Sequence, residues 1–292
     1  MGKEDDGANG LPNGTQMRKA LEKSGYLFEQ KIASFMQKQG FHVDSSWAFK
    51  DPEQEKSREI DVRAIRQVRR DEPNKLQVLC EFLMECKNSD SPLVFLQTEK
   101  NGREIKNQRP REYVFPIPKY QQPIDENSYT EIDAFIRLGL SSSHYYYSTG
   151  LKATQFAKII RKGSDWHANH DGVYDSLILP QVKALEQRRK EVKHSYTKGQ
   201  WASIWLFFNV IVLRDHLFVL DVNEPDALPV STGRVSFVRH VKTADLDEHY
   251  LIDFVTEEYL IDYIKEVAFF AEAVAAFLPD AQTRLLNPKF QD

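Results

Sequence analysis

The chain has 292 residues, of which 41% are hydrophobic and 28% charged, with a formal net charge of -4. These values are typical of a globular protein with a sizeable core, and the acidic balance excludes a protein that coats nucleic acid through bulk positive charge. The longest apolar run, Ile204 to Leu213, is too short to span a bilayer, and the polar Met1–Gly14 segment lacks the apolar core of a signal peptide.

The N-terminal part of the chain begins with a polar segment. We expect residues 1–16, which are rich in glycine and asparagine, to form a disordered tail. A helix is predicted from Met17 to Gly40, because apolar residues recur there at helical spacing and Gly40 is a typical stop. Three strands are predicted next, at residues 41–49, 59–68 and 76–87, separated by charged turns that contain proline.

The middle of the chain is predicted to be an insertion at about residues 98–200. Its first part, Thr98–Thr130, is polar and carries four prolines, which indicates a long loop. Short helices are predicted at 131–140 and 151–162, followed by a longer basic helix at 177–196. No linker rich in Pro, Gly or Ser divides the chain, so we expect one domain over residues 17–280 and a C-terminal tail over 281–292.

The C-terminal part returns to strand character. Strands at 204–213 and 216–222 flank Arg214 and Asp215, which predicts a hairpin. Further strands are predicted at 234–241 and 250–255, and Thr256 is predicted to cap a final helix at 257–277. This order predicts an α/β fold, a mixed central β-sheet flanked by helices.

Two cysteines, Cys80 and Cys86, fall in one predicted strand on one face. Neither belongs to a CxxC pair, which argues against a structural zinc site or a disulfide framework. We interpret them as small buried apolar residues. Such cysteine use is typical of a reducing compartment, so a cytoplasmic location is expected.

Three charged residues lie inside strand-like apolar runs. Asp61 is in Glu59–Ile65, and Glu85 and Lys87 are in Leu79–Lys87. Charges in such runs are costly unless they are paired or bind a metal. Glu85 and Lys87 are two residues apart, so on a strand they point to the same face. With a carboxylate from a neighbouring strand, this set is what metal-assisted phosphodiester hydrolysis needs.

On these residues the sequence resembles the PD-(D/E)xK nuclease superfamily. The matching motifs are Ser57-Arg58-Glu59-Ile60-Asp61-Val62 and Met84-Glu85-Cys86-Lys87-Asn88, 24 residues apart from Asp61 to Glu85. Ile60 stands where the nominal motif has proline. Glu29, on the preceding helix, matches an additional acidic residue of many members. The resemblance covers about residues 17–97 and implies a restriction-endonuclease-like fold with insertions, its sheet completed by the strand at 204–213 and the final strand and helix.

The resemblance also implies roles for these residues. Asp61, Glu85 and the backbone carbonyl of Cys86 would bind Mg²⁺, for which Mn²⁺ can substitute, and Glu29 would bind a metal-bound water or a second metal. Lys87 would orient or deprotonate the attacking water. The implied function is a metal-dependent DNA endonuclease of restriction, repair or defence type, with DNA favoured over RNA. Cleavage of both strands needs two sites, which is compatible with a homodimer.

Three further residues are candidates for binding substrate. Arg58 and Arg63 belong to a basic stretch around the second strand, and some relatives carry a helical glutamine, here Gln181, near the site. The basic helix at 177–196 is another candidate for phosphate contacts, with a solvated helix face as the alternative.

Two other interpretations remain open. Asp61 could pair with Arg63 or Arg58, and Glu85 with Lys87, as exposed charges on an edge strand. The chain could also be a catalytically inactive nuclease-fold protein that serves as a nucleic-acid or protein binding scaffold. The presence of Asp61, Glu85 and Lys87 together argues against such a loss of activity. A separate histidine-rich segment, 167–171, is interpreted as a surface loop because a matching second half of a metal site is absent from the sequence.

Overall fold

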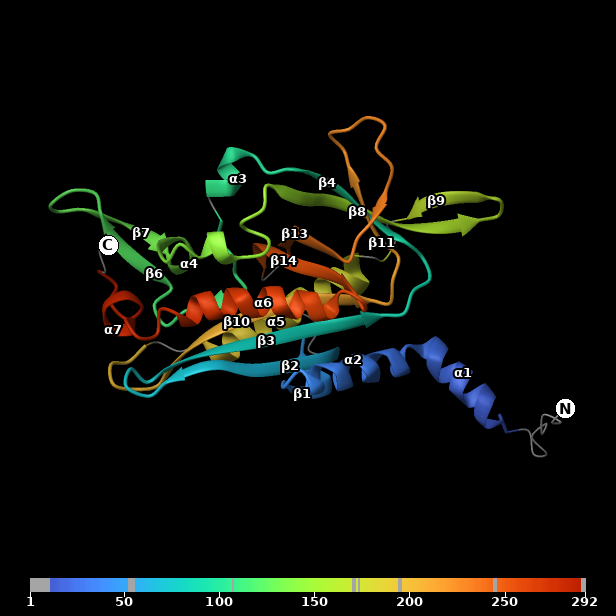
Figure 1. Ribbon diagram of the computed structural model, residues 1–292, viewed down its shortest axis with the longest axis horizontal. Helices are drawn as coiled ribbons and strands as arrows, with labels where there is room; N and C mark the ends of the chain where they lie inside the picture. Colours follow the sequence, from blue (N-terminus) through green and yellow to red (C-terminus); the bar gives the residue numbers. More distant parts are fainter. Residues whose placement is uncertain are drawn as a thin grey trace.

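A large mixed sheet forms the centre of the molecule in the computed structural model, which describes residues 11–51, 56–106, 108–169, 172, 174–193, 196–243 and 246–289 (Figure 1). Along the sheet the strands follow the order β1 (His42–Lys50), β2 (Ser57–Asp71), β3 (Leu76–Lys87), β10 (Ala202–Leu213), β14 (Asp247–Thr256), β13 (Arg234–Lys242), β8 (Leu151–Lys162), β4 (Leu93–Glu99), β11 (Leu217–Asp221) and β12 (Val230–Ser231). The predicted α/β class, a mixed sheet flanked by helices, is therefore confirmed.

The strand directions change along the sheet. β1, β2 and β3 form an antiparallel meander, whereas β10 runs parallel to β3 and β14 runs parallel to β10. Smaller strands extend this frame: β5 (Tyr113–Val114) pairs with β10, β9 (Asp165–Asn169) pairs with β8, and β6 (Lys119–Pro123) pairs with β7 (Tyr129–Asp133) in a separate sheet. The parallel strands β3 and β10 are buried along most of their length, as their apolar runs predict.

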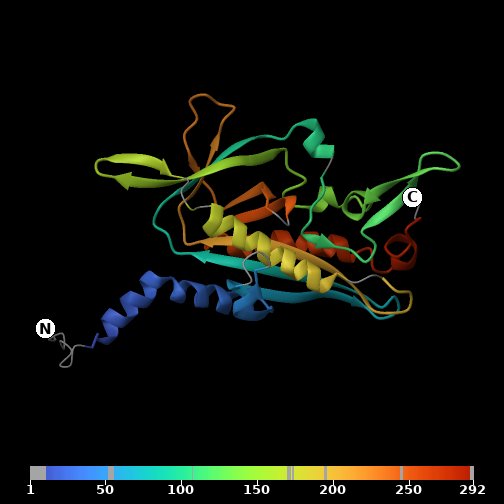
Figure 2. The ribbon, with the colours of Figure 1, turned by 180° about the vertical axis from the view of Figure 1, so that it is seen from behind.

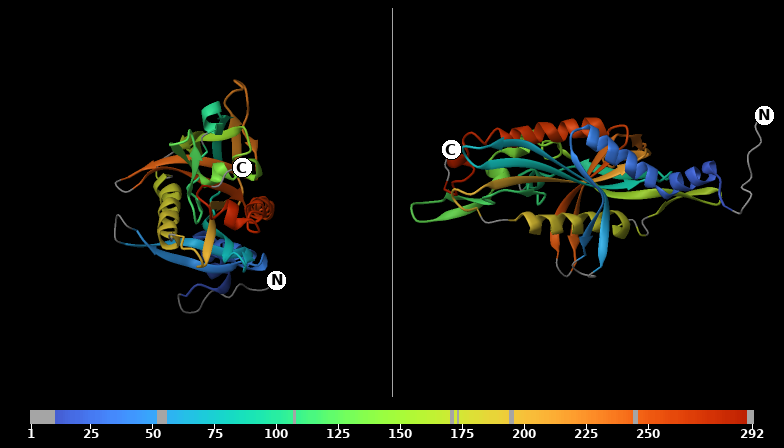
Figure 3. Two further views of the ribbon diagram at one scale, coloured as in Figure 1. Left: turned by 90° about the vertical axis from the view of Figure 1, so that its left-hand side faces the viewer. Right: turned by 90° about the horizontal axis from the view of Figure 1, so that it is seen from below.

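Helices cover both faces of the sheet. On one face, α2 (Tyr26–Lys38) and α6 (Leu260–Ala275) pack into one hydrophobic cluster. On the other face, α5 (Leu179–Val192) contributes to a second cluster. Figure 2 shows α5 in front of the strands, and the end-on view in Figure 3 places α5 and α6 on opposite sides. The described helices also include α1 (Gly14–Ser24), α3 (Gly102–Lys106), α4 (Ala134–Arg137) and α7 (Ala281–Arg284), and none is long and apolar enough to cross a membrane.

The predicted helix at residues 17–40 is two helices. Gly25 separates them with a φ of 91°, a left-handed conformation that ends α1 before α2 begins. α2 buries Phe28, Ile32 and Met36 on one stripe, whereas α1 buries no residue and extends away from the body. Gly14 to Gln16 belong to α1, so the expected disordered tail over residues 1–16 is wrong for these three residues; residues 1–10 lie outside the described residues.

The insertion differs most from its prediction. Residues 151–162 form strand β8 rather than a helix, because they pair with β4 along most of that strand. Residues 131–140 divide among β7, α4 and the start of a short 3-10 turn, and the predicted loop 98–130 carries α3, β5 and β6. In the predicted surface loop 167–171, residues 167–169 are the end of β9, and His170 and Asp171 lie outside the described residues.

Three predictions in the C-terminal part also differ from the structure. The strands at 204–213 and 217–221 are not a hairpin, because β10 pairs with β3 and β14 while β11 pairs with β4 and β12. Thr256 is the last residue of β14, and α6 begins at Leu260 without a side-chain cap. The expected tail over 281–292 contains α7 and buried Leu285, whose carbonyl accepts a hydrogen bond from the Tyr120 hydroxyl at 3.0 Å.

Candidate active site

The predicted catalytic residues gather at one end of the parallel strands. The ladder between β2 and β3 ends at the pair Val62 and Met84, one residue short of Asp61 and Glu85. Beyond that pair the Asp61 side chain, instead of the backbone, bridges the two strands: its Oδ2 accepts a hydrogen bond from the Cys86 amide at 2.7 Å. The backbone ladder between the two strands therefore ends where the acidic residues lie.

Lys87 and Glu85 form the second half of this group. The Lys87 Nζ donates to Glu85 Oε1 at 2.5 Å. The Lys87 side chain is 32% exposed and that of Glu85 only 12%. Lys87 also stands beside Leu213 of β10, which stands beside Thr256 of β14, so the group lies at the carboxyl edge of three parallel strands. The ammonium is consequently held between the buried carboxylate and solvent.

Glu29 reaches this group from α2. Its carboxyl interacts electrostatically with both Asp61 and Lys87, and Glu85 interacts with Glu29. The charge of a further carboxylate, Glu59, also raises the pKa of Glu29 and of Asp61. Glu59 was not among the predicted catalytic residues. The signal was present, because Glu59 lies two residues before Asp61 and so faces the same side of a strand. The four predicted catalytic residues are thus brought together, with Glu59 beside them.

The electrostatics of the site are those of crowded, partly buried acids. Burial is the largest cause that raises the pKa of Asp61, of Glu85 and of Glu29 above their usual ranges. Repulsion from Asp61 raises the pKa of the two glutamates further, while attraction to Lys87 lowers the pKa of all three groups. One lysine does not compensate for several carboxylates, so the site favours an added cation.

This donor set fits a hard divalent cation. Asp61 and Glu85 offer carboxylate oxygens, and the carbonyl of Cys86 lies between Glu85 and Lys87 on β3. In the described part of the chain no three His, Cys, Asp or Glu side chains lie close enough to hold a metal by themselves. A cation here would therefore take two carboxylates and complete its shell with backbone oxygen and water, as Mg²⁺ commonly does.

The predicted substrate-binding arginines are engaged in ion pairs. Arg63 donates to Glu81 Oε1 at 2.7 Å and to Asp44 Oδ2 at 2.9 Å, and its side chain is 15% exposed. Arg58 donates to the fully buried carboxylate of Asp51. Arg63 and Arg58 therefore stabilise buried acids in this structure, and their role toward substrate stays a prediction.

Gln181 and the basic helix also lie inside the fold. Gln181 of α5 is fully buried and donates from Nε2 to the Val210 carbonyl of β10 at 3.1 Å, so it does not reach the surface. On the same helix, Lys183 contacts Asp51 and Arg188 contacts Glu81, both through buried side chains. The alternative of a solvated helix face is wrong for these residues, because they fix α5 to the sheet.

The cysteines behave as expected from the sequence. Cys80 and Cys86 are free and buried, and burial raises the pKa of the Cys86 thiol well above its usual value. Both therefore act as small core residues.

Comparison of the chain with protein-family models, with curated proteins and with solved structures gives no match. The resemblance to a nuclease superfamily therefore rests on the sequence motifs alone.

Proposed function

We propose that this protein is a metal-dependent nuclease that hydrolyses phosphodiester bonds and acts as an endonuclease on DNA. The observation that carries the proposal is the gathering of Glu29, Asp61, Glu85 and Lys87 from a helix and two strands at one edge of the sheet. In partly buried surroundings, one lysine leaves the negative charge of three acids uncompensated. A bound cation would balance that charge and could in turn hold a phosphate.

Each residue has a role that its position supports. Asp61 and Glu85 would hold Mg²⁺, which would neutralise charge on the scissile phosphate. The hydrogen bond from the Cys86 amide fixes the orientation of the Asp61 carboxylate. Lys87, whose ammonium is partly exposed beside Glu85, orients the attacking water and stabilises developing charge on the phosphate. Glu29 adds an acid on the α2 side of the site.

The order of the elements supports a restriction-endonuclease-like fold. Helix α2 precedes the antiparallel strands β1, β2 and β3, and the chain later crosses through α5 to β10, which runs parallel to β3. The resemblance implies that the strand at 204–213 and the final strand and helix complete the sheet, and the parallel pairing of β10 with β3 and β14 supports this proposal.

Helix α1 supplies positive charge next to the site. It carries Arg18, Lys19 and Lys23 against one acid, Glu22, which pairs with Arg18 at 3.1 Å, and none of its residues is buried. Its end lies close to the end of β3, because the Asn88 side chain donates to the Glu22 carbonyl at 2.8 Å. An exposed basic helix in this position is suited to contact the phosphates that flank a cleavage point.

The proposal is tested by cleavage of supercoiled plasmid, linear double-stranded DNA, single-stranded DNA and RNA, with Mg²⁺ or Mn²⁺ titrated from zero. We expect metal-dependent plasmid cleavage by the wild-type protein. Asp61→Asn, Glu85→Gln and Lys87→Ala should each lower the rate by about a hundredfold or more, because each removes a ligand or a group that stabilises the transition state.

The matched controls are Glu131→Gln and Lys119→Ala. These residues form an exposed ion pair at 2.9 Å on β6 and β7, outside the site, so both variants should cleave like the wild type. A wild-type protein that binds DNA but cleaves none of the four substrates with either metal would overturn the nuclease and favour a binding scaffold. Equal cleavage by wild type and Lys87→Ala would overturn the assigned site.

A further inference from the structure

A polar cavity lies at the end of strand β14 away from the candidate active site. It has a volume of about 600 Å³, within the roughly 300–1,000 Å³ common for small-molecule sites. Its walls come from α3 and its flanks, the Tyr146–Tyr147 segment, the start of β8, and strands β13 and β14. Leu251, in its wall, is five residues from Thr256 at the candidate active site, or about 17 Å along the strand. The two sites are therefore separate.

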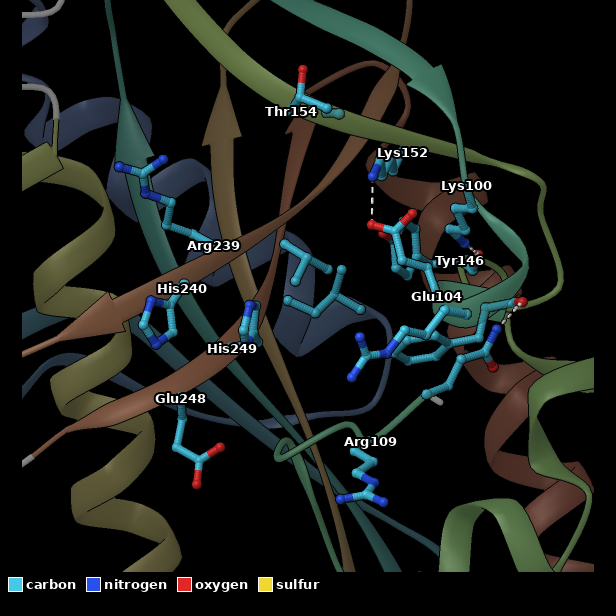
Figure 4. A pocket seen from close by; sticks show the side chains of 16 residues that line it. Lys100, Glu104, Arg109, Tyr146, Lys152, Thr154, Arg239, His240, Glu248 and His249 are labelled. Atoms are coloured by element: carbon cyan, nitrogen blue, oxygen red, sulfur yellow. Dashed lines mark hydrogen bonds and ion pairs between the residues drawn. The ribbon is translucent and has the colours of Figure 1, made fainter. Parts of the chain in front are cut away.

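Positive charge dominates the lining of this cavity. Five basic side chains line it against two carboxylates: Lys100, Arg103, Arg109, Lys152 and Arg239 against Glu104 and Glu248, with Arg109 paired to Asp133 at 3.3 Å. Figure 4 shows Arg239, His240 and His249 on one side of the space, with Lys100, Glu104 and Lys152 on the other.

The two carboxylates are already paired. Glu104 pairs with Lys152, and Glu248 pairs with Arg111 at 2.5 Å. Within the described ranges no carboxylate forms an ion pair with Arg103 or Arg239, and both arginines are exposed. The cavity thus keeps guanidinium groups that a phosphate can engage, and guanidinium is the side-chain group best matched to phosphate oxygens.

Two more deeply buried side chains in the lining indicate what else a ligand of this cavity would carry. The Lys100 ammonium is buried and, among the described residues, donates to the carbonyls of Tyr146 at 2.7 Å and Thr149 at 2.9 Å; its pKa is lowered to about 8 by burial. Gln108 is 5% exposed and donates to the Tyr147 carbonyl at 2.9 Å, while its Oε1 is buried without a partner among the described residues. An acceptor of this kind is costly unless a ligand hydroxyl or amino group donates to it.

We propose that this cavity binds a nucleotide. The phosphates would interact with Arg103 and Arg239, and a sugar hydroxyl or base amino group would donate to Gln108. The volume, the excess of cations and the unpartnered acceptor together suit a small ligand that carries several negative charges and a neutral hydrogen-bonding part. This proposal does not rest on the nuclease activity.

Binding is measured by isothermal titration calorimetry without divalent metal at low salt, because salt weakens phosphate contacts. The probes are the four ribonucleoside triphosphates, the four monophosphates, tripolyphosphate and adenosine. We expect at least one nucleotide to bind, tripolyphosphate to bind more weakly, and adenosine to give no measurable heat. Arg103→Ala and Arg239→Ala should each weaken nucleotide binding about tenfold.

The matched control is Arg161→Ala, an exposed arginine near the far end of β8, which should bind like the wild type. Gln108→Leu should weaken nucleotide binding and leave tripolyphosphate binding unchanged; the two arginine variants test the site even if this buried substitution impairs folding. Absence of binding by every nucleotide, or equal affinity in wild type, Arg103→Ala and Arg239→Ala, would overturn the proposal. If a single-stranded oligonucleotide binds more tightly than any nucleotide, and Arg239→Ala weakens that binding equally, the nucleotide proposal is overturned and the ligand is a nucleic-acid strand.

Discussion

At the scale of single residues, the arrangement of the carboxylates at the candidate active site opposes stability of the metal-free fold. Asp61 and Glu85 are largely buried, and burial followed by mutual repulsion raises the pKa of Glu85. A carboxyl whose folded-state pKa is raised holds its proton more tightly in the folded than in the unfolded chain. The free energy of unfolding therefore falls as the pH rises from the pKa of the carboxyl in the unfolded chain to its pKa in the folded chain. Above the folded-state pKa the full loss of stability is reached.

This balance predicts the behaviour of Asp61→Asn. Asparagine keeps an oxygen for the Cys86 amide and removes one charge, so without metal at pH 8 the variant should melt at a higher temperature than the wild type. Mg²⁺ at about a hundred times its Kd should stabilise the wild type by about 2.7 kcal/mol and the variant far less. Differential scanning calorimetry with and without Mg²⁺ measures both effects, and Asp262→Asn on α6, paired with Lys265 on the surface, is the control. Equal stabilisation of wild type and Asp61→Asn by Mg²⁺ would contradict a cation at Asp61.

At the scale of elements, α5 is held to the sheet by charges as well as by apolar packing. Arg188 donates from Nε and Nη2 to the two oxygens of Glu81 at 2.7 and 2.9 Å, and Glu81 on β3 is fully buried. Arg63 of β2 donates to the same carboxylate. This network joins the helix to the two strands that carry the proposed catalytic residues, so it positions the candidate site indirectly.

Removal of one member of this network should destabilise the protein strongly. Arg188→Ala leaves the buried Glu81 with Arg63 alone, and the expected loss in free energy of unfolding is about 3 kcal/mol. Lys190→Ala, an exposed cation on the same helix, should change it by less than about 0.5 kcal/mol. Urea denaturation followed by circular dichroism measures both values. A loss for Arg188→Ala no larger than for Lys190→Ala would show that apolar packing alone fixes α5.

At the scale of the whole molecule, the two terminal segments differ in how they join the core. Helix α1 near the N-terminus buries no residue and extends outward, whereas the segment after α6 returns to the body through α7 and Leu285. Leu285 is 1% exposed and belongs to the cluster formed by α2 and α6. The C-terminal segment is therefore part of the folding unit, and α1 is available for contacts outside it.

Matched leucine truncations distinguish the two segments. Leu285→Ala should lower the free energy of unfolding by about 2–5 kcal/mol, because it opens a cavity in the core. Leu21→Ala on α1, where the leucine is 44% exposed, should change it by less than about 0.5 kcal/mol. Chemical denaturation of the two variants gives the comparison. A large loss for Leu21→Ala would mean that α1 is covered in solution, for example by a second copy of the chain.

Local patterns were sufficient for much of the first half of the chain. The apolar runs before and after Asp61 predicted β2, and the run ending at Lys87 predicted β3, since burial on both faces leaves a nearly continuous apolar signal. The period of two in Glu85-Cys86-Lys87 placed both charges on one side. The sequence by itself therefore determined the strands that carry Asp61, Glu85 and Lys87, although it did not single out Glu59 beside Asp61.

Tertiary pairing decided the rest. The amphipathic run 151–162 reads as a helix, yet its hydrogen bonds go to β4, more than fifty residues earlier, which local spacing does not reveal. Local spacing also does not reveal that β10 pairs with β3 and β14 instead of with β11, the next strand along the chain. Nor does it reveal the acidic partners of Arg58 and Arg63, which come from other parts of the chain. The nucleotide-sized cavity was likewise absent from the sequence patterns, because its cations come from distant segments that only the folded sheet brings together.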